Sequence, residues 1–178
     1  SSLLSIAANR STYPTLKKEH LMIFHLTNFI LDVDVERTRA FYSLPEVPTT
    51  SEGCTCEDCQ NFDKAILTVP ATVTEFLQSL GIDPQKPIEA FSVTGEHEPD
   101  GTILYNGWYH VCGKVIEWPK FKQTENHLSY SWEDCHRPDP SFHFDIIAVP
   151  TIDLAREQMP TPIIQLDFDT YLPYVLQN

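Results

Sequence analysis

The sequence predicts an α+β fold, with short helices in the N-terminal half and a mainly antiparallel sheet in the C-terminal half. Two observations lead to this class. Apolar residues recur at helical spacing between residues 34 and 81, whereas from residue 87 onward they alternate with polar residues, as in half-buried strands. Helices followed by consecutive strands are typical of α+β domains, because a parallel sheet requires strands and helices to alternate along the chain.

The N-terminal half is expected to open with a strand and a helix. The run MIFHLTNFILDV, residues 22–33, has the apolar composition of a strand. The next segment, DVERTRAFYSL at residues 34–44, predicts a short helix. Asp34 stands at or near its N-cap, and Pro45 ends it.

Two further helices are expected before the strands begin. NFDKAIL, residues 61–67, predicts a short helix. PATVTEFLQSLGI, residues 70–82, predicts a stronger one, because Pro70 suits the start of a helix and Gly81 suits its C-terminal stop. The apolar residues on one face of this helix are Val73, Phe76, Leu77 and Leu80.

Four strands are expected in the C-terminal half, separated by turns such as EPDG at residues 98–101. Consecutive strands joined by short turns favour antiparallel pairing. The four segments are PIEAFSVTG (87–95), TILYNGWYHVCGKVIEW (102–118), SFHFDIIAV (141–149) and TPIIQLDFDTYL (161–172).

The chain of 178 residues has the size of one domain and contains no internal repeat. Its first 21 residues differ from the rest, since three basic residues oppose one acidic residue there, whereas the whole chain carries a net charge of -13. Met22 stands directly before the first expected strand. We therefore expect residues 1–21 to be a loosely packed N-terminal extension and residues 22–178 to form a single α+β domain.

The charge balance bears on the class of partner. The chain has 25 acidic residues against 12 basic ones, so its surface repels phosphate backbones and attracts basic molecules. This argues against direct nucleic-acid binding. Either the charge serves solubility alone, or it forms a surface that meets a basic protein. The apolar run at residues 22–33 is too short and too often interrupted by polar residues to span a membrane.

Three cysteines gather within six positions, in the segment CTCEDC. The C-x-C-x-x-C spacing lets three thiolates approach one metal ion from a single loop, and zinc takes four ligands. A fourth is offered by two residues that are two positions apart and therefore lie on one face of an expected strand. The candidate zinc ligands are Cys54, Cys56, Cys59, His110 and Cys112.

Other interpretations of the cysteines stay open beside zinc. Cys135 and His136 form a second candidate ligand pair, and an iron–sulfur cluster could use Cys112 or Cys135 as its fourth ligand. A disulfide would leave at least one of the five cysteines unpaired, and Cys54 and Cys56 are too close in sequence to pair readily. A redox thiol pair is disfavoured by the acidic residues around the cluster.

Patterns of well-known catalytic sites are absent from the sequence. It contains no G-x-S-x-G, no P-loop, no G-x-G-x-x-G and no H-E-x-x-H. His143 and Asp145 match the opening of a two-histidine, one-carboxylate iron site, but no histidine follows them in the chain.

Four segments, DVDVERTRAFY, CTCEDCQNFDKAI, FLQSLGIDPQKPIEAF and DGTILYNGWYHVCG, carry a resemblance to a family. The chain resembles small bacterial proteins of unknown function that share a clustered-cysteine loop, an LGIDP turn and a YH-x-x-G strand. The resemblance covers about the middle half of the chain. It implies a bacterial, cytoplasmic setting and one compact domain, supplies no activity, and favours treating His110 and the three clustered cysteines as one site.

Two functions follow from these observations. The first is a non-enzymatic acidic binding protein, of inhibitor or immunity type, with a structural zinc site and an acidic face that covers a basic protein. The second is a small zinc-dependent hydrolase with an open metal position and Glu52 or Asp58 as its general base. We favour the first, because sulfur-rich zinc sites are more often structural.

Overall fold

The computed structural model of the chain describes residues 21–27, 29–95, 97–118, 122–124, 127–129, 135–147 and 158–176. Its strands are β1 (Leu21–His25), β2 (Ile30–Asp34), β3 (Glu89–Ser92), β4 (Thr102–Glu117), β5 (Lys122–Thr124), β6 (His127–Ser129), β7 (His136–Asp139), β8 (Phe142–Ile147) and β9 (Ile163–Pro173). Its helices are α1 (Val35–Tyr42), α2 (Thr50–Gly53), α3 (Glu57–Ala65), the short 3₁₀ helix η1 (Ile66–Thr68) and α4 (Ala71–Ser79).

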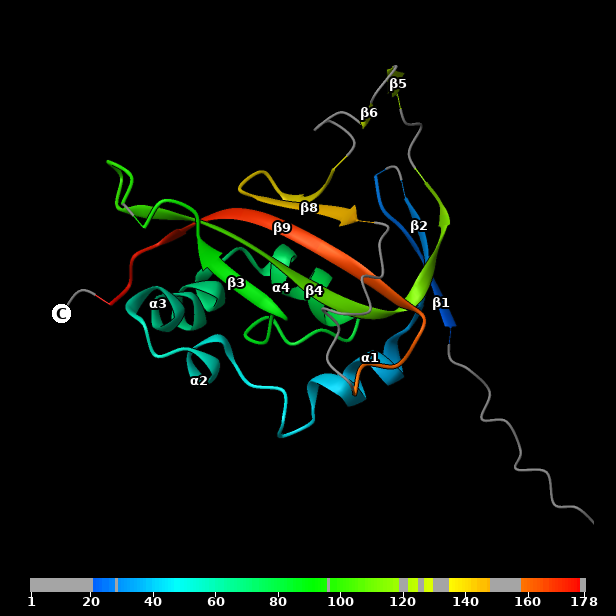
Figure 1. Ribbon diagram of the computed structural model, residues 1–178, viewed down its shortest axis with the longest axis horizontal. Coiled ribbons are helices and arrows are strands. Elements are labelled where there is room, and N and C mark those ends of the chain that lie inside the picture. The colour runs from blue at the N-terminus through cyan, green and yellow to red at the C-terminus, as the bar shows by residue number, and fades with distance from the viewer. Residues whose placement is uncertain are drawn as a thin grey trace, which may run out of the picture.

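A seven-stranded antiparallel sheet forms the centre of the fold (Figure 1). Its strand order is β1-β2-β4-β9-β8-β7, and β3 pairs with β4. The long pairing of β4 with β9 runs from Thr102 opposite Pro173 to Cys112 opposite Ile163. β5 and β6 form a separate pair. The α+β class predicted from the sequence is confirmed.

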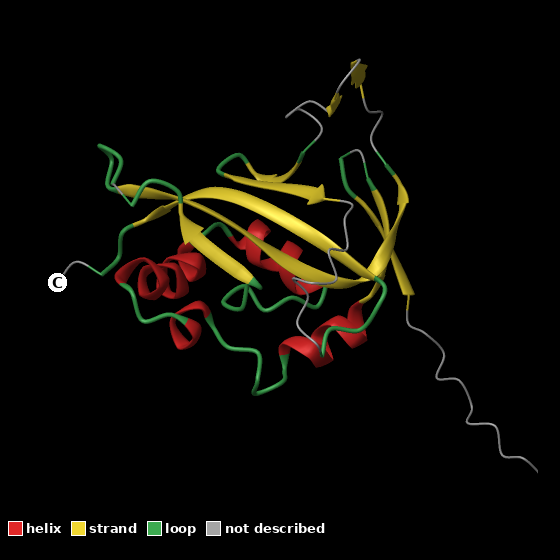
Figure 2. Cartoon of the chain, in the orientation of Figure 1, coloured by secondary structure: helices red, strands yellow, loops and turns green. Residues whose placement is uncertain are grey.

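The helices gather along one side of the sheet (Figure 2). Every second side chain of β4 faces the helices and is buried. The same holds for the side chains of β9 that are paired with these residues. Phe62 of α3 packs against Tyr105 of β4 and Phe168 of β9, with ring centroids 5.4 and 5.9 Å apart. The alternate residues of β4 and β9 therefore form the opposite face of the sheet, which includes Trp108 and Asp167.

Several expected element ends are confirmed by their local chemistry. The Oδ1 atom of Asp34 accepts a hydrogen bond from the backbone N–H of Arg37 at 3.0 Å, which makes Asp34 the N-cap of α1. Gly81 follows α4 with a φ of 85°. A Cβ atom there would lie 2.5 Å from the carbonyl oxygen of Val35, so only glycine fits this stop beside α1.

The structure corrects the expected elements at two places. The run 22–33 is two strands, because the chain turns where the backbone N–H of Leu26 donates to the carbonyl of Phe29 at 2.9 Å. The helix expected at residues 61–67 begins earlier, at Glu57. The predicted extension at residues 1–21 lies outside the described residues except for Leu21, and so does the end of the strand expected at residues 141–149.

Candidate metal centre

The three clustered cysteines meet where α2 gives way to α3. Cys54 is the C-cap residue of α2, and Cys56 is the N-cap residue of α3 with an extended backbone. Cys59 lies in the first turn of α3, which returns its side chain to the start of the helix. The local helix ends therefore bring together the sulfurs that the C-x-C-x-x-C spacing predicted.

The distances between the sulfurs suit a metal ion. The ligand atoms of Cys54, Cys56 and Cys59 all lie within 4.8 Å of one another, and Sγ of Cys54 contacts Sγ of Cys56 at 3.3 Å. A tetrahedral zinc ion with Zn–S bonds of about 2.3 Å needs sulfurs about 3.8 Å apart. The three thiols could thus hold one ion after small side-chain movements. Cys54 and Cys56 are exposed, and Cys59 is buried.

Hydrogen bonds between protein groups hold the loop that carries the sulfurs. The carboxylate of Asp63 accepts hydrogen bonds from the backbone N–H groups of Thr50 at 3.0 Å and Ser51 at 2.9 Å. The side chain of Gln60 donates to the carbonyl of Thr55 at 2.7 Å. A loop fixed in this way loses little conformational freedom when a metal ion binds.

The sheet adds a further support to the loop. The hydroxyl of Tyr105 donates to the carbonyl of Asp58 at 2.9 Å and accepts from Nδ2 of Asn61 at 3.2 Å. Burial raises the pKa of Tyr105 to about 12, so the phenol stays neutral and remains a donor at physiological pH. Tyr105 thereby anchors the first turn of α3, next to Cys59, to β4.

The three thiols differ in how readily they ionise. The pKa of Cys54 is lowered, first by the hydrogen bond from the backbone N–H of Cys56 and then by hydrogen bonds with the thiols of Cys56 and Cys59. The pKa of Cys59 is raised, mainly by burial and then by its hydrogen bonds with the other two thiols. A bound cation would favour ionisation of Cys59, because a coordinating thiol loses its proton.

The structure does not bring His110 or Cys112 into the cysteine group. Among the described residues, the group able to hold a metal contains Cys54, Cys56 and Cys59 alone. Tyr105, the residue of β4 that contacts the cysteine loop, lies on one face of the strand, whereas His110 and Cys112 lie on the other face. His110 is also five positions further along the strand. Nε2 of His110 lies 3.2 Å from Oε1 of Gln165. The second candidate pair is separate too, since Cys135 lines a pocket on the sheet and His136 packs on Phe76.

A pocket of about 240 Å³ adjoins the cysteines. Cys54 and Cys59 line it together with Thr50 and Glu89, which comes from β3. Oγ1 of Thr50 is buried and has no hydrogen-bond partner in the part of the chain that the structure describes. The pocket therefore offers a free hydroxyl beside the sulfurs, whereas Glu89 pairs opposite Trp108 and so directs its side chain to the other face of the sheet.

The two carboxylates predicted from the sequence as a general base each have a hydrogen-bond partner. Glu52 accepts from the backbone N–H of Thr49 at 2.7 Å, as part of the capping box of α2. Asp58 accepts a hydrogen bond from the hydroxyl of Ser92 in β3. Residues 87–90 line the pocket, and the sequence did not predict this because they lie about thirty positions beyond Cys59 and come near only through the packing of the fold.

Comparison of the chain with known proteins found no matching family model, no matching curated protein and no matching solved structure. Within the described residues, no helix is both long enough and apolar enough to cross a membrane. Fold and site together define a class: an α+β protein with a three-cysteine cluster that could hold a metal ion. The resemblance to small bacterial cysteine-loop proteins stays a prediction.

Proposed function

We propose that this protein is a non-enzymatic acidic binding protein, of inhibitor or immunity type, whose fold is locally fixed by zinc. The observation that carries the metal part is the convergence of Cys54, Cys56 and Cys59 within 4.8 Å. Zinc is favoured over other ions because three thiolates are soft ligands and the spacing suits a tetrahedron. Three sulfurs leave one of the four usual positions to another ligand.

The zinc ion would act as a clamp between two helices. Cys54 ends α2 and Cys56 begins α3, so an ion shared by them fixes the angle between these helices. α3 in turn packs on the sheet through Phe62. The metal therefore stabilises the loop against the rest of the domain, which is the usual role of a sulfur-rich zinc site.

The binding role is supported by the charge of the chain. A net charge of -13 gives a field that attracts basic proteins and speeds their association. Capture of a basic protein should therefore weaken as salt rises, since the field is screened within about 8 Å at physiological ionic strength. A partner whose affinity ignores salt would contradict this part of the proposal.

The metal part is tested by elemental analysis of protein purified without added metal. We expect about one zinc ion per chain, and loss of that zinc in Cys54→Ser and Cys59→Ser. Cys135→Ala is the matched control, because Cys135 lies outside the cysteine group. Protein without metal, whose cluster thiols all react freely, would overturn the zinc proposal.

A second candidate function, a zinc-dependent hydrolase, is favoured by the pocket beside the cysteines. In that case the fourth position holds water, and Glu52 or Asp58, the carboxylates next to the cysteines in the sequence, accepts its proton. The test is hydrolysis of a nitrophenyl ester by the zinc-loaded protein. The double variant Glu52→Gln, Asp58→Asn should abolish hydrolysis while the zinc content stays unchanged, and an inactive native protein would exclude this candidate for esters.

A further inference from the structure

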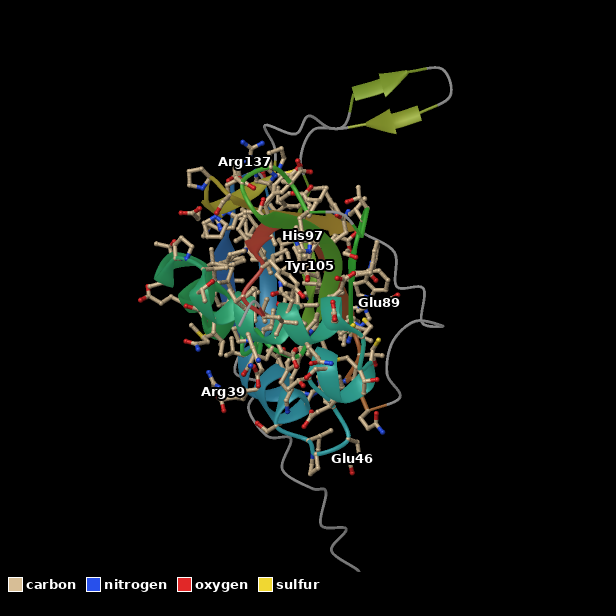
Figure 3. The ribbon with its side chains drawn as sticks, turned by 90° about the vertical axis from the view of Figure 1, so that its left-hand side faces the viewer. Arg39, Glu46, Glu89, His97, Tyr105 and Arg137 are labelled. Atoms are coloured by element: carbon tan, nitrogen blue, oxygen red, sulfur yellow. The ribbon has the colours of Figure 1, made fainter. Side chains whose placement is uncertain are left out.

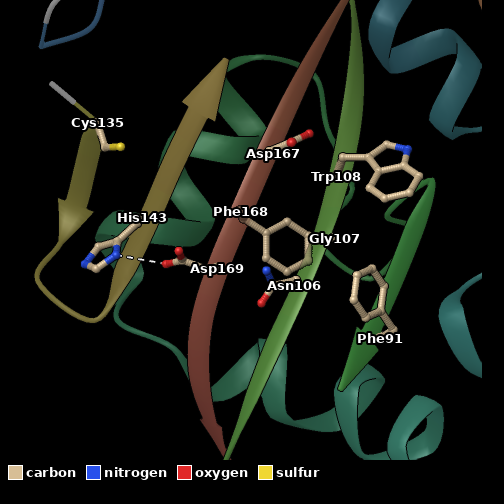
Figure 4. A pocket seen from close by; sticks show the side chains of 9 residues that line it. All are labelled: Phe91, Asn106, Gly107, Trp108, Cys135, His143, Asp167, Phe168 and Asp169. Atoms are coloured by element: carbon tan, nitrogen blue, oxygen red, sulfur yellow. Dashed lines mark ion pairs between the residues drawn. The ribbon is translucent and has the colours of Figure 1, made fainter. Parts of the chain in front are cut away.

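A second pocket, of about 210 Å³, lies on the face of the sheet that the helices do not cover (Figure 4). Four strands supply its walls. The side chains that line it include Phe91 of β3, Asn106 and Trp108 of β4, His143 of β8, and Asp167 and Asp169 of β9.

Strand register places carboxylates next to aromatic and amide groups in this pocket. Trp108 stands opposite Asp167, and Asn106 stands opposite Asp169. Phe91 is opposite Asn106 on the next strand. In Figure 4 the two carboxylates extend from β9, with the rings of Trp108 and Phe91 on one side of that strand. The pocket thus combines negative charge with flat apolar surfaces.

The two carboxylates have different partners. Oδ1 of Asp169 forms an ion pair with Nδ1 of His143 at 2.9 Å, drawn as the dashed line in Figure 4. Oδ1 of Asp167 accepts a hydrogen bond from Nε2 of Gln165 at 2.8 Å. Burial nevertheless raises the pKa of Asp167, which shows that its surroundings compensate its charge poorly. No Lys or Arg side chain is among the described residues that line the pocket.

The amide of Asn106 supplies an independent observation. Its Oδ1 atom is buried and has no hydrogen-bond partner among the residues described. A buried acceptor without a donor costs free energy, so such groups usually meet water or a ligand. Nε1 of Trp108, a donor, is likewise buried without a partner among the described residues. For the carboxylates and the amide oxygen, the missing complement is a group with several N–H donors and a positive charge.

We propose that this pocket binds the guanidinium group of an arginine side chain on a basic protein. This inference rests on the proposed binding role and names the side chain that the pocket recognises. A guanidinium is planar, permanently charged and carries five N–H donors, so it can serve Asp167 and Asn106 together. Its flat faces stack on aromatic rings. An ammonium group has neither the plane nor the fork of donors.

The rim of the pocket is suited to protein contact. Phe91 is 45% exposed although it is a large apolar side chain. Aromatic and arginine side chains are the residues most often found at the energetic centre of protein interfaces. An arginine that enters the pocket would cover the ring of Phe91 and remove it from water.

The test uses Nα-acetyl-arginine methylamide as the probe and records the NMR signals of the Asn106 amide and the Trp108 indole. We expect saturable shifts with a Kd of about 1 mM, as befits so small a ligand. The lysine analogue should bind about tenfold more weakly, and the neutral citrulline analogue should leave the signals unchanged. Equal binding of citrulline and arginine would overturn the proposal, as would the absence of any shift.

Variants separate the pocket from the overall charge. Asp167→Asn and Phe91→Ala should each weaken binding of the arginine probe about tenfold. Glu46→Gln is the matched control, because it also removes one negative charge. Glu46 lies at the lower end of the molecule in Figure 3, away from β3, whose position is marked there by Glu89. This variant should bind the arginine probe as the wild type does. Wild-type affinity in both pocket variants would overturn the proposal.

Two further outcomes are distinguishable. Saturation of the same signals by Ca²⁺, with no response to arginine, would assign a metal ion to the pocket and refute the arginine inference. If the arginine probe does not bind, the zinc content and any salt-dependent capture of a basic protein are unaffected. A failure of this inference can therefore be told apart from a failure of the proposed function.

Discussion

The side chain of Asp63 holds the start of the preceding helix: its Oδ2 atom accepts a hydrogen bond from the backbone N–H of Ser51 at 2.9 Å. Ser51 also donates its hydroxyl to the same carboxylate. The N–H groups of a first helical turn have no partner within their own helix, so a buried carboxylate satisfies them and complements the helix dipole. Ser51 lies in α2, before the cysteine loop, and Asp63 lies in α3, after it, so this hydrogen bond ties the two ends of the loop together.

We expect Asp63→Ala to lower the free energy of unfolding by about 2 kcal/mol, because it leaves the part-buried backbone N–H and hydroxyl of Ser51 without their acceptor. The same change should weaken zinc binding, since the loop ends lose their tie. Urea denaturation and a competitive zinc titration measure the two effects. Glu46→Ala, at an exposed position, serves as the control. An unchanged zinc affinity in Asp63→Ala would show that the loop needs no preorganisation.

Removal of zinc should destabilise the protein. A ligand that binds only the folded state at 100 times its Kd adds about 2.7 kcal/mol, so chelation should lower Tm by several degrees. Thermal melts with and without a chelator test this expectation. In Cys56→Ser the two melting curves should coincide. A chelator effect that persists in this variant would place the ion elsewhere.

Cys112, one of the two residues expected from the sequence to complete the site, can be tested in the same way. Since the structure leaves Cys112 outside the cysteine group, we expect Cys112→Ala to keep its zinc. It should still lose stability, because Cys112 is buried in β4 and its replacement leaves a small void. Loss of zinc in folded Cys112→Ala would restore this residue as a ligand.

The sequence predicted those features that depend on neighbours along the chain. The caps at Asp34 and Gly81 follow from local backbone chemistry, and the cysteine group follows from a spacing of six positions. The division of β1 from β2 was missed, because most of the run is apolar and it contains neither Gly nor Pro to mark the turn.

Features that depend on strand order could not be predicted. Alternation showed that His110 and Cys112 share a face of their strand, but not whether that face meets the helices. The pocket on the sheet requires Trp108 opposite Asp167, a register that arises only once β9 pairs with β4. No pattern local to either strand predicts this pairing.

Stability should fall in mild acid, and His136 should be one cause. Burial lowers the pKa of His136, whose ring packs on Phe76 with centroids 4.6 Å apart. The folded state therefore binds this proton less readily than the unfolded chain does. The resulting stability is present above the unfolded pKa of about 6.5 and is lost as pH falls through the lower folded value.

Urea unfolding at pH 8 and pH 5.5 measures this contribution. His136→Gln should reduce the loss of stability between the two pH values, whereas His25→Gln, at an exposed position, should not. An identical loss in wild type and His136→Gln would assign the acid sensitivity to other groups.

The pocket on the sheet predicts a change that stabilises the fold and impairs binding. The pKa of Asp167 is raised by burial, so the stability that the protonated group contributes is present below the unfolded pKa of about 3.9 and is lost as pH rises through the folded value. Asp167→Asn removes this loss, because the amide oxygen still accepts from Gln165 and carries no charge. We expect Asp167→Asn to raise the free energy of unfolding at pH 7 by less than about 1 kcal/mol, since the side chain is partly exposed to solvent.

Most substitutions destabilise a protein, so a gain in stability from Asp167→Asn would be unusual. Such a gain together with weaker arginine binding would indicate that the carboxylate of Asp167 serves recognition at the expense of stability. Denaturation at pH 7 and pH 3.5 checks the first effect, with Glu46→Gln at an exposed position as the control. A loss of stability in Asp167→Asn at pH 7 would show that its carboxylate is well compensated and that the pocket lacks no cation.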